Sequence, residues 1–383
     1  MKTLRCITMT AASLVFASAA FAKDEANPQI TKPVPARPLV QLAILLDTSG
    51  SMQGLIEQAK GQLWKIVNEF LKAKQDGQTP EVQVALYEYG KSSLSGSSGW
   101  IRQIVPLSTD LDKISEELFA LKTDGGDEYC GWVIKDALNN LQWSKDTKVY
   151  RAIIIAGNEP FTQGPVSYVD SGKAAITRGI IVNTIHCGDE ATGINTKWQD
   201  GAVLADGKYM VIDHNRAVVH IEAPQDKEIA KLSTELNGTY LAFGVEGVVA
   251  YKRQAAQDQN AMLLAPASGA AVQRAVAKSS VNYRNSSWDL VDASMEEDFK
   301  LGEVKAEHLP AEMQKMSETK RKMFIEKKAK ERTELQAKIQ SLSTEREKYI
   351  AEQRKQNAAT NTLDAVVIGA VREQASKRDF DFE

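Results

Sequence analysis

The sequence predicts an α/β fold: a doubly wound, mostly parallel sheet with one antiparallel edge strand, followed by a C-terminal α-helical region. Long apolar runs, such as residues 39–46 and 150–157, are typical of strands buried on both faces. Amphipathic segments such as residues 52–71 separate these runs. Because parallel strands need helical crossovers, this alternation indicates a doubly wound sheet. Only residues 82–89 and 101–107 are joined by a tight turn, which predicts the antiparallel edge strand.

The remaining elements follow the same alternation along the chain. Apolar side chains recur every three or four residues from Met52 to Phe70, as on one face of a helix. Further strands are expected over residues 179–188 and 208–213. Further helices are expected over residues 110–121, 129–141, 167–178 and 195–205.

The N-terminus has the pattern of an export signal. A basic start and an apolar run that ends in an alanine–phenylalanine–alanine triplet are typical of a cleaved signal peptide, here residues 1–22. Four prolines lie among the polar residues 23–38, which predicts a linker. We therefore expect a periplasmic protein whose mature chain has no membrane span.

Composition limits the classes of partner. The chain has 383 residues, of which 43% are hydrophobic and 25% charged, as expected for a globular protein with room for two domains. Its formal net charge is -3, and removing residues 1–22 takes away Lys2 and Arg5 and no acidic residue, which gives -5. This mild acidity argues against nucleic acid as a partner.

The amino-acid composition changes in the C-terminal part of the chain. From residue 309 the chain is rich in charged residues, with a thin apolar stripe formed by Leu335, Ile339, Leu342 and Tyr349. This spacing predicts a solvated helix or helical hairpin, or else a coiled coil that supports self-association. The expected divisions are an α/β domain over residues 39–222, a mixed helix and loop extension over residues 223–308, and this helical segment over residues 309–383.

Oxygen-bearing side chains gather directly after the first strand, in the stretch LLDTSGSM. Asp47 ends that strand, and Ser49 and Ser51 follow at intervals of two residues. Doubly wound sheets bind ligands at the carboxyl ends of their strands. A carboxylate and two hydroxyls are hard ligands, which suit Mg²⁺, Mn²⁺ or Ca²⁺ better than zinc or copper. A helix cap needs only one such residue, so three in alternation predict one wall of a cation site.

Two further loops should reach the same edge of the sheet. The stretch TDGGDEY precedes an expected helix, and AGNEPF follows a buried strand. Their candidate oxygen ligands are Thr123, Asp124, Asp127, Glu128, Asn158 and Glu159.

The pattern Asp47-x-Ser49-x-Ser51, between a buried strand and an amphipathic helix, resembles the metal-ion-dependent adhesion site of von Willebrand factor type A domains. The order of elements is also similar over residues 39–215, which is just under half of the chain. The resemblance implies a Rossmann-like sheet and a non-enzymatic protein-binding function. A divalent cation, most simply Mg²⁺, would keep one coordination position open for an acidic side chain of a partner protein.

The sequence departs from the family pattern on the other two loops. The family supplies a threonine from the second loop, whereas here Asp127 follows the glycine pair, with Thr123 as the competing candidate. The third loop has Asn158 where the family has an aspartate. Two carboxylates would then still surround the cation, although one of them has moved to a different loop. The rival interpretation is a degenerate site, in an envelope scaffold that acts through its helical tail.

Two other interpretations involve reactive side chains. A serine hydrolase could use Ser49 with His186, but the stretch lacks the Gly-x-Ser-x-Gly elbow that such enzymes need. Cys130 and Cys187 are both expected at the carboxyl edge of the sheet, either as two separate thiols or joined in a disulfide that would hold the Asp127 loop in place.

Overall fold

The computed structural model describes residues 37–212, 221–264, 269–356 and 363–382. The expected signal peptide and nearly all of the expected linker lie outside these residues. Within them, no helix is both long and apolar enough to cross a membrane.

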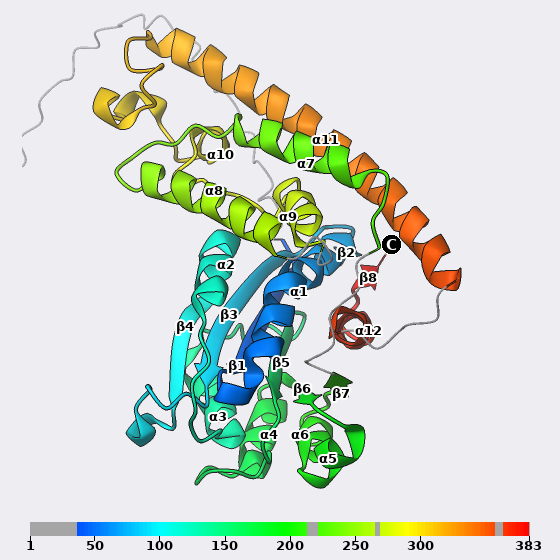
Figure 1. Cartoon of the computed structure of the whole chain (residues 1–383). Coiled ribbons are helices and arrows are strands. Elements are labelled where there is room, and N and C mark those ends of the chain that lie inside the picture. Colours follow the sequence, from blue (N-terminus) through cyan, green and yellow to red (C-terminus); the bar gives the residue numbers. More distant parts are fainter. Residues whose placement is uncertain (1–36, 213–220, 265–268, 357–362, 383) are drawn as a thin grey trace, which may run out of the picture. The chain divides into compact units, whose positions relative to one another are not determined.

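Six strands form the central sheet, in the order β4-β3-β1-β5-β6-β7 (Figure 1). All neighbouring strands are parallel except β3 and β4. The predicted doubly wound sheet with one antiparallel edge strand is therefore confirmed. The strands are β1 (Leu39–Asp47), β3 (Glu81–Tyr89), β4 (Ile101–Ser108), β5 (Tyr150–Gly157), β6 (Ile181–Cys187) and β7 (Tyr209–Ile212).

β1 lies in the middle of the sheet and contributes to two separate cores. Leu42 and Leu46 belong to one core, and Ala43 and Leu45 belong to the other. Successive side chains of a strand point to opposite faces, so both faces of β1 must be covered by apolar side chains. This explains why the run is apolar at nearly every position.

Helices cover both faces of the sheet. The core that contains Leu42 also contains side chains of α1 (Gln53–Lys72), α2 (Leu111–Ala120) and α12 (Leu363–Ser376), together with Ala277 of α9 (Ala270–Lys278). The opposite core contains side chains of α3 (Cys130–Asn140), α4 (Tyr168–Thr177) and α6 (Trp198–Val203), and α5 (Glu190–Asn195) precedes α6. A short strand, β2 (Ala73–Lys74), follows α1 and pairs with β8 (Asp381–Phe382).

The C-terminal region has a core of its own. It is built on α7 (Asp226–Asn237), α8 (Gly247–Leu263), α9 (Ala270–Lys278), α10 (Leu290–Ala293) and α11 (Glu318–Gln356). Leu335 and Ile339 of α11 are buried against side chains of α7 and α9, and Figure 1 shows α11 running beside α7. The apolar stripe of the charged segment is therefore used within the chain.

The two last helices pack on different elements. α11 lies along α7 and α9, whereas α12 packs on α1 and places Val367 and Val371 in a core of the sheet domain. The expected helical hairpin is not the arrangement that forms. The apolar side chains of α12 are buried instead in the core that contains Leu42.

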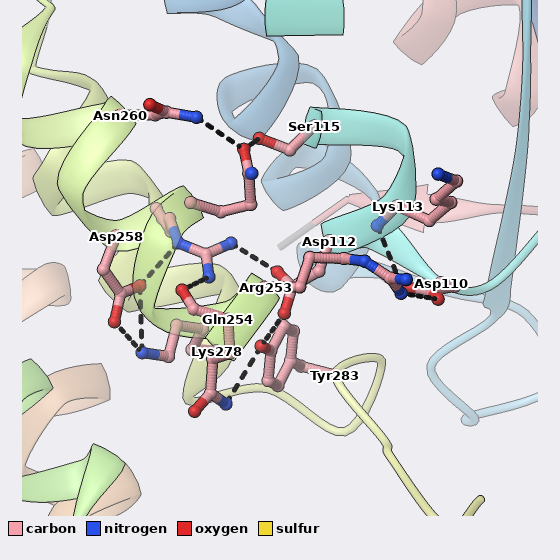
Figure 2. A network of polar contacts seen from close by, with 12 residues as sticks. Asp110, Asp112, Lys113, Ser115, Arg253, Gln254, Asp258, Asn260, Lys278 and Tyr283 are labelled. Carbon is pink, nitrogen blue, oxygen red and sulfur yellow. Dashed lines mark hydrogen bonds and ion pairs between the residues drawn. The ribbon is translucent and has the colours of Figure 1, made fainter. Parts of the chain in front are cut away.

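A buried ionic network joins α2 of the sheet domain to the C-terminal region (Figure 2). The guanidinium of Arg274 donates to Asp112 through Nη1 and to Asp258 through Nε, both at 2.6 Å. The ammonium of Lys278 donates to Asp258 at 2.8 Å, and the hydroxyl of Tyr283 donates to Asp112 at 2.5 Å. Each buried carboxylate thus has a cation and a second hydrogen-bond donor.

Replacing Arg274 by methionine should strongly destabilise the protein. The change keeps an unbranched side chain but removes the cation shared by two buried carboxylates, which typically costs about 3–5 kcal/mol. The matched control is Lys322→Met, because the ion pair of Lys322 with Glu318 is exposed to solvent and should contribute less than about 1 kcal/mol. Chemical denaturation measures both free energies of unfolding, and equal losses would contradict the structural role given to Arg274.

Candidate metal centre

The candidate centre lies where three neighbouring strands end. Asp47 is the last residue of β1, and it is paired with Tyr89 at the end of β3. Leu46 is paired with Ala156, so the end of β5 lies directly beside Asp47. From β1 the chain builds the sheet outward to β3 and β4 on one side and then continues with β5, β6 and β7 on the other side. Such a switch point is where doubly wound sheets bind ligands.

Asp47 is completely buried, and only one of its two carboxylate oxygens accepts a hydrogen bond from a backbone or neutral side-chain donor. Its Oδ1 accepts a hydrogen bond from the backbone N–H of Ser49 at 2.7 Å, while Oδ2 has no hydrogen-bond partner. An unpartnered oxygen in a buried carboxylate is costly unless another group satisfies it. The neighbouring carboxyl of Glu128 can share a proton with Asp47, and a bound cation could take the place of that proton.

Two glycines allow the loops to close around this carboxylate. A Cβ at Gly157 would lie 3.0 Å from Oδ2 of Asp47 and 2.6 Å from the hydroxyl of Tyr89. A Cβ at Gly90 would lie 3.0 Å from Oδ1 of Asp47 and 2.7 Å from Cγ of Glu128, and Gly90 has a positive φ of 79°. Both positions are therefore closed to other residues by contact with the site.

Three of the other predicted ligands converge beside Asp47. The hydroxyls of Ser49 and Ser51 are 3.3 Å apart, and the hydroxyl of Ser51 lies 3.5 Å from Oδ1 of Asn158. Ser49 stands at the N-cap position of a short 3-10 helix, Gly50–Met52, yet its side chain makes no capping hydrogen bond. The hydroxyls are therefore not used as a helix cap.

The second loop presents a different carboxylate from the one that the sequence indicated. Asp127 is exposed and accepts a hydrogen bond from the hydroxyl of Tyr129 at 3.3 Å, and Thr123 donates to Gln53 at 3.2 Å. Glu128 is buried and lies beside Asp47. The structure thus brings Glu128, and neither Asp127 nor Thr123, to the centre.

The reason lies in the path of the loop. Asp124 donates its backbone N–H to Thr48, and Glu128 donates its own to the side chain of Gln163 at 2.6 Å. These two hydrogen bonds hold the loop at both ends. Glu128 is turned inward and Asp127 outward. The alignment of the glycine pair with the family pattern could not reveal this one-residue shift.

The two carboxyls lack a compensating cation. Burial, followed by the effect of Asp47, raises the pKa of Glu128 to about 10, and burial also raises the pKa of Asp47. In the described part of the chain, no basic side chain forms an ion pair with either of them. The neighbouring buried carboxylate of Glu88, in contrast, is compensated by Arg102 at 2.5 Å and Lys91 at 3.9 Å.

The donor set fits a hard divalent cation. Asp47 and Glu128 supply carboxylate oxygens, Ser49 and Ser51 supply hydroxyls, and Asn158 supplies an amide oxygen, all of which suit Mg²⁺, Mn²⁺ or Ca²⁺. Across the described residues, no three side chains of histidine, cysteine, aspartate or glutamate converge into a metal-binding group. Hydroxyl and amide oxygens would therefore have to complete the coordination.

Comparison with known protein families identifies the domain that holds these strands and loops. Residues 41–194 match the family model of the von Willebrand factor type A domain. This chain contains a von Willebrand factor type A (VWA) domain. No curated protein matches the chain.

Several solved structures are similar to this VWA domain in fold. BatB from Bacteroides thetaiotaomicron is 19% identical, over 45% of this chain and 90% of its own, with a TM-score of 0.35. The SpRpn10 VWA domain is 16% identical, over 45% and 88%, with a TM-score of 0.35. Proximal thread matrix protein 1 from the mussel byssus, solved with zinc in its metal-ion-dependent adhesion site, is 12% identical, over 47% and 43%, with a TM-score of 0.36.

Of the two alternatives for Cys130 and Cys187, the structure has two separate thiols and no disulfide between them. Cys130 and Cys187 are both buried and free. Cys130, at the start of α3, belongs to the core on one face of the sheet, and its thiol donates to the hydroxyl of Tyr89 at 3.8 Å. Cys187, at the end of β6, belongs to the core on the other face. The two thiols therefore lie on opposite faces of the sheet, although both residues are near its carboxyl edge.

His186 and Ser49 have different neighbours. The ring of His186 packs against Trp198, with 5.8 Å between the ring centroids, and a Cβ at Gly193 would lie 2.8 Å from it. The hydroxyl of Ser49 is paired with that of Ser51. Ser49 is instead hydrogen-bonded to the carboxyl groups of Asp47 and Glu128.

Glu128→Gln should raise the thermal stability of the cation-free protein at neutral and alkaline pH. The folded-state pKa of Glu128, about 10, lies above its ordinary value of 4.5, so the folded protein holds a proton that the unfolded chain releases. Stability then falls as pH rises through this window, and glutamine removes that decline. Melting temperatures in chelator, from about pH 5 to about pH 9, should show a flatter profile for the variant.

The control for this measurement is Asp127→Asn, which changes the neighbouring exposed carboxylate. Its profile should follow that of the unmodified protein. If Glu128→Gln and Asp127→Asn gave the same profile, Glu128 would not be the carboxyl whose proton is linked to folding.

Proposed function

We propose that the protein is a non-enzymatic, divalent-cation-dependent protein-binding module of the bacterial envelope, located in the periplasm. The observation that carries the proposal is the unpartnered Oδ2 of the buried Asp47, next to a second uncompensated carboxyl at Glu128. A bound cation would satisfy both groups. VWA domains mediate protein–protein interactions, and the binding partner is proposed to be a protein.

The proposed ligands are Asp47, Ser49, Ser51, Glu128 and Asn158. Mg²⁺ is the proposed ion, with Mn²⁺ or Ca²⁺ as substitutes of the same hard character. The ion would supply a positive centre at the edge of the sheet that attracts an acidic side chain of the partner. Asn158 contributes a neutral oxygen in place of a third carboxylate, which leaves more of the cation's charge for this outside ligand.

Access to the centre supports this role. Gly50 and Ser51 are exposed, so one wall of the centre faces solvent. The C-terminal region contacts the sheet domain elsewhere: Asn68, near the far end of α1, donates to the backbone carbonyl of Gln273 at 2.8 Å. A partner could therefore reach the cation without displacing the helices.

Calorimetry with Mg²⁺ and Mn²⁺ tests the cation site and its ligands. The unmodified protein should bind one cation, Asp47→Ala should abolish binding, and Glu128→Ala should weaken it by at least an order of magnitude, because each removes a carboxylate. Asp127→Ala is the matched control and should bind normally. Failure of the unmodified protein to bind either cation would favour an envelope scaffold that acts through its helices, and loss with Asp127→Ala alone would restore Asp127 as the ligand.

Capture from periplasmic extract tests the binding function. The mature protein should retain a specific partner in Mg²⁺ and release it in chelator, while Asp47→Ala should retain none under either condition. Acidic side chains of the partner should be required, so a carboxylate-to-amide variant of the identified contact should also fail to bind. Retention that is indifferent to the chelator would contradict the cation-dependent proposal.

A further inference from the structure

α8 buries its polar face and exposes its apolar face, which is the reverse of an ordinary amphipathic helix at a protein surface. It buries polar side chains, among them Gln254 and Gln257, which are 1% and 2% exposed. Its exposed apolar side chains include Val248, Val249, Met262 and Leu263. A surface helix normally buries its apolar stripe and exposes its polar face. An apolar patch that remains on the surface commonly marks an interaction site.

Hydrogen bonds of the buried face hold α8 in this orientation. Gln254 donates to the hydroxyl of Tyr283 at 3.1 Å, and Gln257 accepts from the hydroxyl of Ser115 at 2.9 Å. Asp258 accepts from Arg274 and Lys278 in the network of Figure 2. Turning the apolar face inward would break all of these contacts and leave buried charges unpaired, which is strongly unfavourable. The contacts of the buried polar face therefore keep the apolar face of α8 exposed to solvent.

The exposed face has a seven-residue repeat. Val248 and Val249 are 58% and 54% exposed, and Met262 and Leu263 are 54% and 74% exposed. Midway between these pairs lie two exposed alanines, at positions 255 and 256. The steps from the valines to the alanines and from the alanines to the Met262–Leu263 pair are both seven residues, so all three pairs share one face. Small residues at the centre allow another helix to approach closely.

We propose that this face binds the same face of a second copy of the chain, with the two α8 helices antiparallel. A two-fold axis between positions 255 and 256 places Val248 opposite Leu263 of the second copy and Val249 opposite Met262. The face is thereby complementary to itself, as a two-fold interface requires.

The polar positions of the face favour the same geometry. Lys252 and Gln259 lie on the face between the three apolar pairs. The antiparallel register places Lys252 opposite Gln259 of the second copy, where the amide oxygen can accept a hydrogen bond from the ammonium. A parallel pair would instead place two like charges against each other at position 252, which is unfavourable.

The size of α8 sets the strength of the contact. The helix has 17 residues, or about 25 Å at 1.5 Å per residue. A pair of helices of this length buries well under the roughly 1,600 Å² of a standard interface. The dimer is therefore weak and reversible, with a dissociation constant in the micromolar range or above.

Sedimentation equilibrium over a concentration series tests the proposal, with charge substitutions across the register. Val248→Glu alone and Leu263→Lys alone should each give a monomer, because a charge would be buried against an apolar side chain. The double variant Val248→Glu with Leu263→Lys should restore the dimer, since each new carboxylate then lies opposite a new ammonium. Val203→Glu is the matched control: Val203 is 68% exposed on α6, and this variant should dimerise as the unmodified protein does.

The outcomes separate this proposal from its rivals. A monomeric unmodified protein at all concentrations would overturn it, and so would a double variant that stays monomeric while its melting temperature is unchanged. Binding of the unmodified protein to lipid vesicles without dimerisation would assign the face to a membrane instead. Cation binding measured by calorimetry should be the same in all four variants, so failure of the dimer leaves the proposal for the cation site unaffected.

Discussion

The parallel pairing of β1 with β3 and β5 is the constraint on which the rest of the structure depends. It forces three loops to leave the sheet at one edge, beside Asp47. Both faces of the sheet are covered by helices, and ligands of such sheets bind at the carboxyl edge. Gly90 and Gly157 then let two of the loops approach the carboxylate more closely than any side chain would allow. The candidate centre therefore depends on the parallel direction of the strands, which brings the loops together, as well as on the ligand residues that the loops carry.

Electrostatic compensation divides the buried acids of the molecule into two classes. Asp112 and Asp258 are paired with Arg274, and Glu88 is paired with Arg102. These pairs hold elements together and need no further ligand. Asp47 and Glu128 have no such partner among the described residues, and their pKa values are raised instead. Buried charge without compensation is disfavoured by folding, so it is found chiefly where a ligand supplies the missing charge.

The network around Arg274 also determines the orientation of α8 in the C-terminal region. It connects α2 to α8 and α9 through buried ions, and the same contacts hold the polar face of α8 inward. The last two helices also pack within the chain: α11 packs on α7 and α9, and α12 packs on α1. The region is therefore an integral extension of the VWA domain and not a separate tail. Its one large unpartnered apolar face among the described residues is that of α8.

The sequence by itself determined the order of strands and helices, the antiparallel edge strand, and the gathering of Asp47, Ser49, Ser51 and Asn158, because these depend on local periodicity and on residues at strand ends. Only the tertiary structure decided which loop carboxylate faces inward, since the choice between Asp127 and Glu128 depends on hydrogen bonds to Thr48 and Gln163 that lie far away in the sequence. It also decided that Cys130 and Cys187 stay apart and that α12 packs under the sheet. Each of these outcomes depends on which surface an element meets in space, and local pattern carries no information about that.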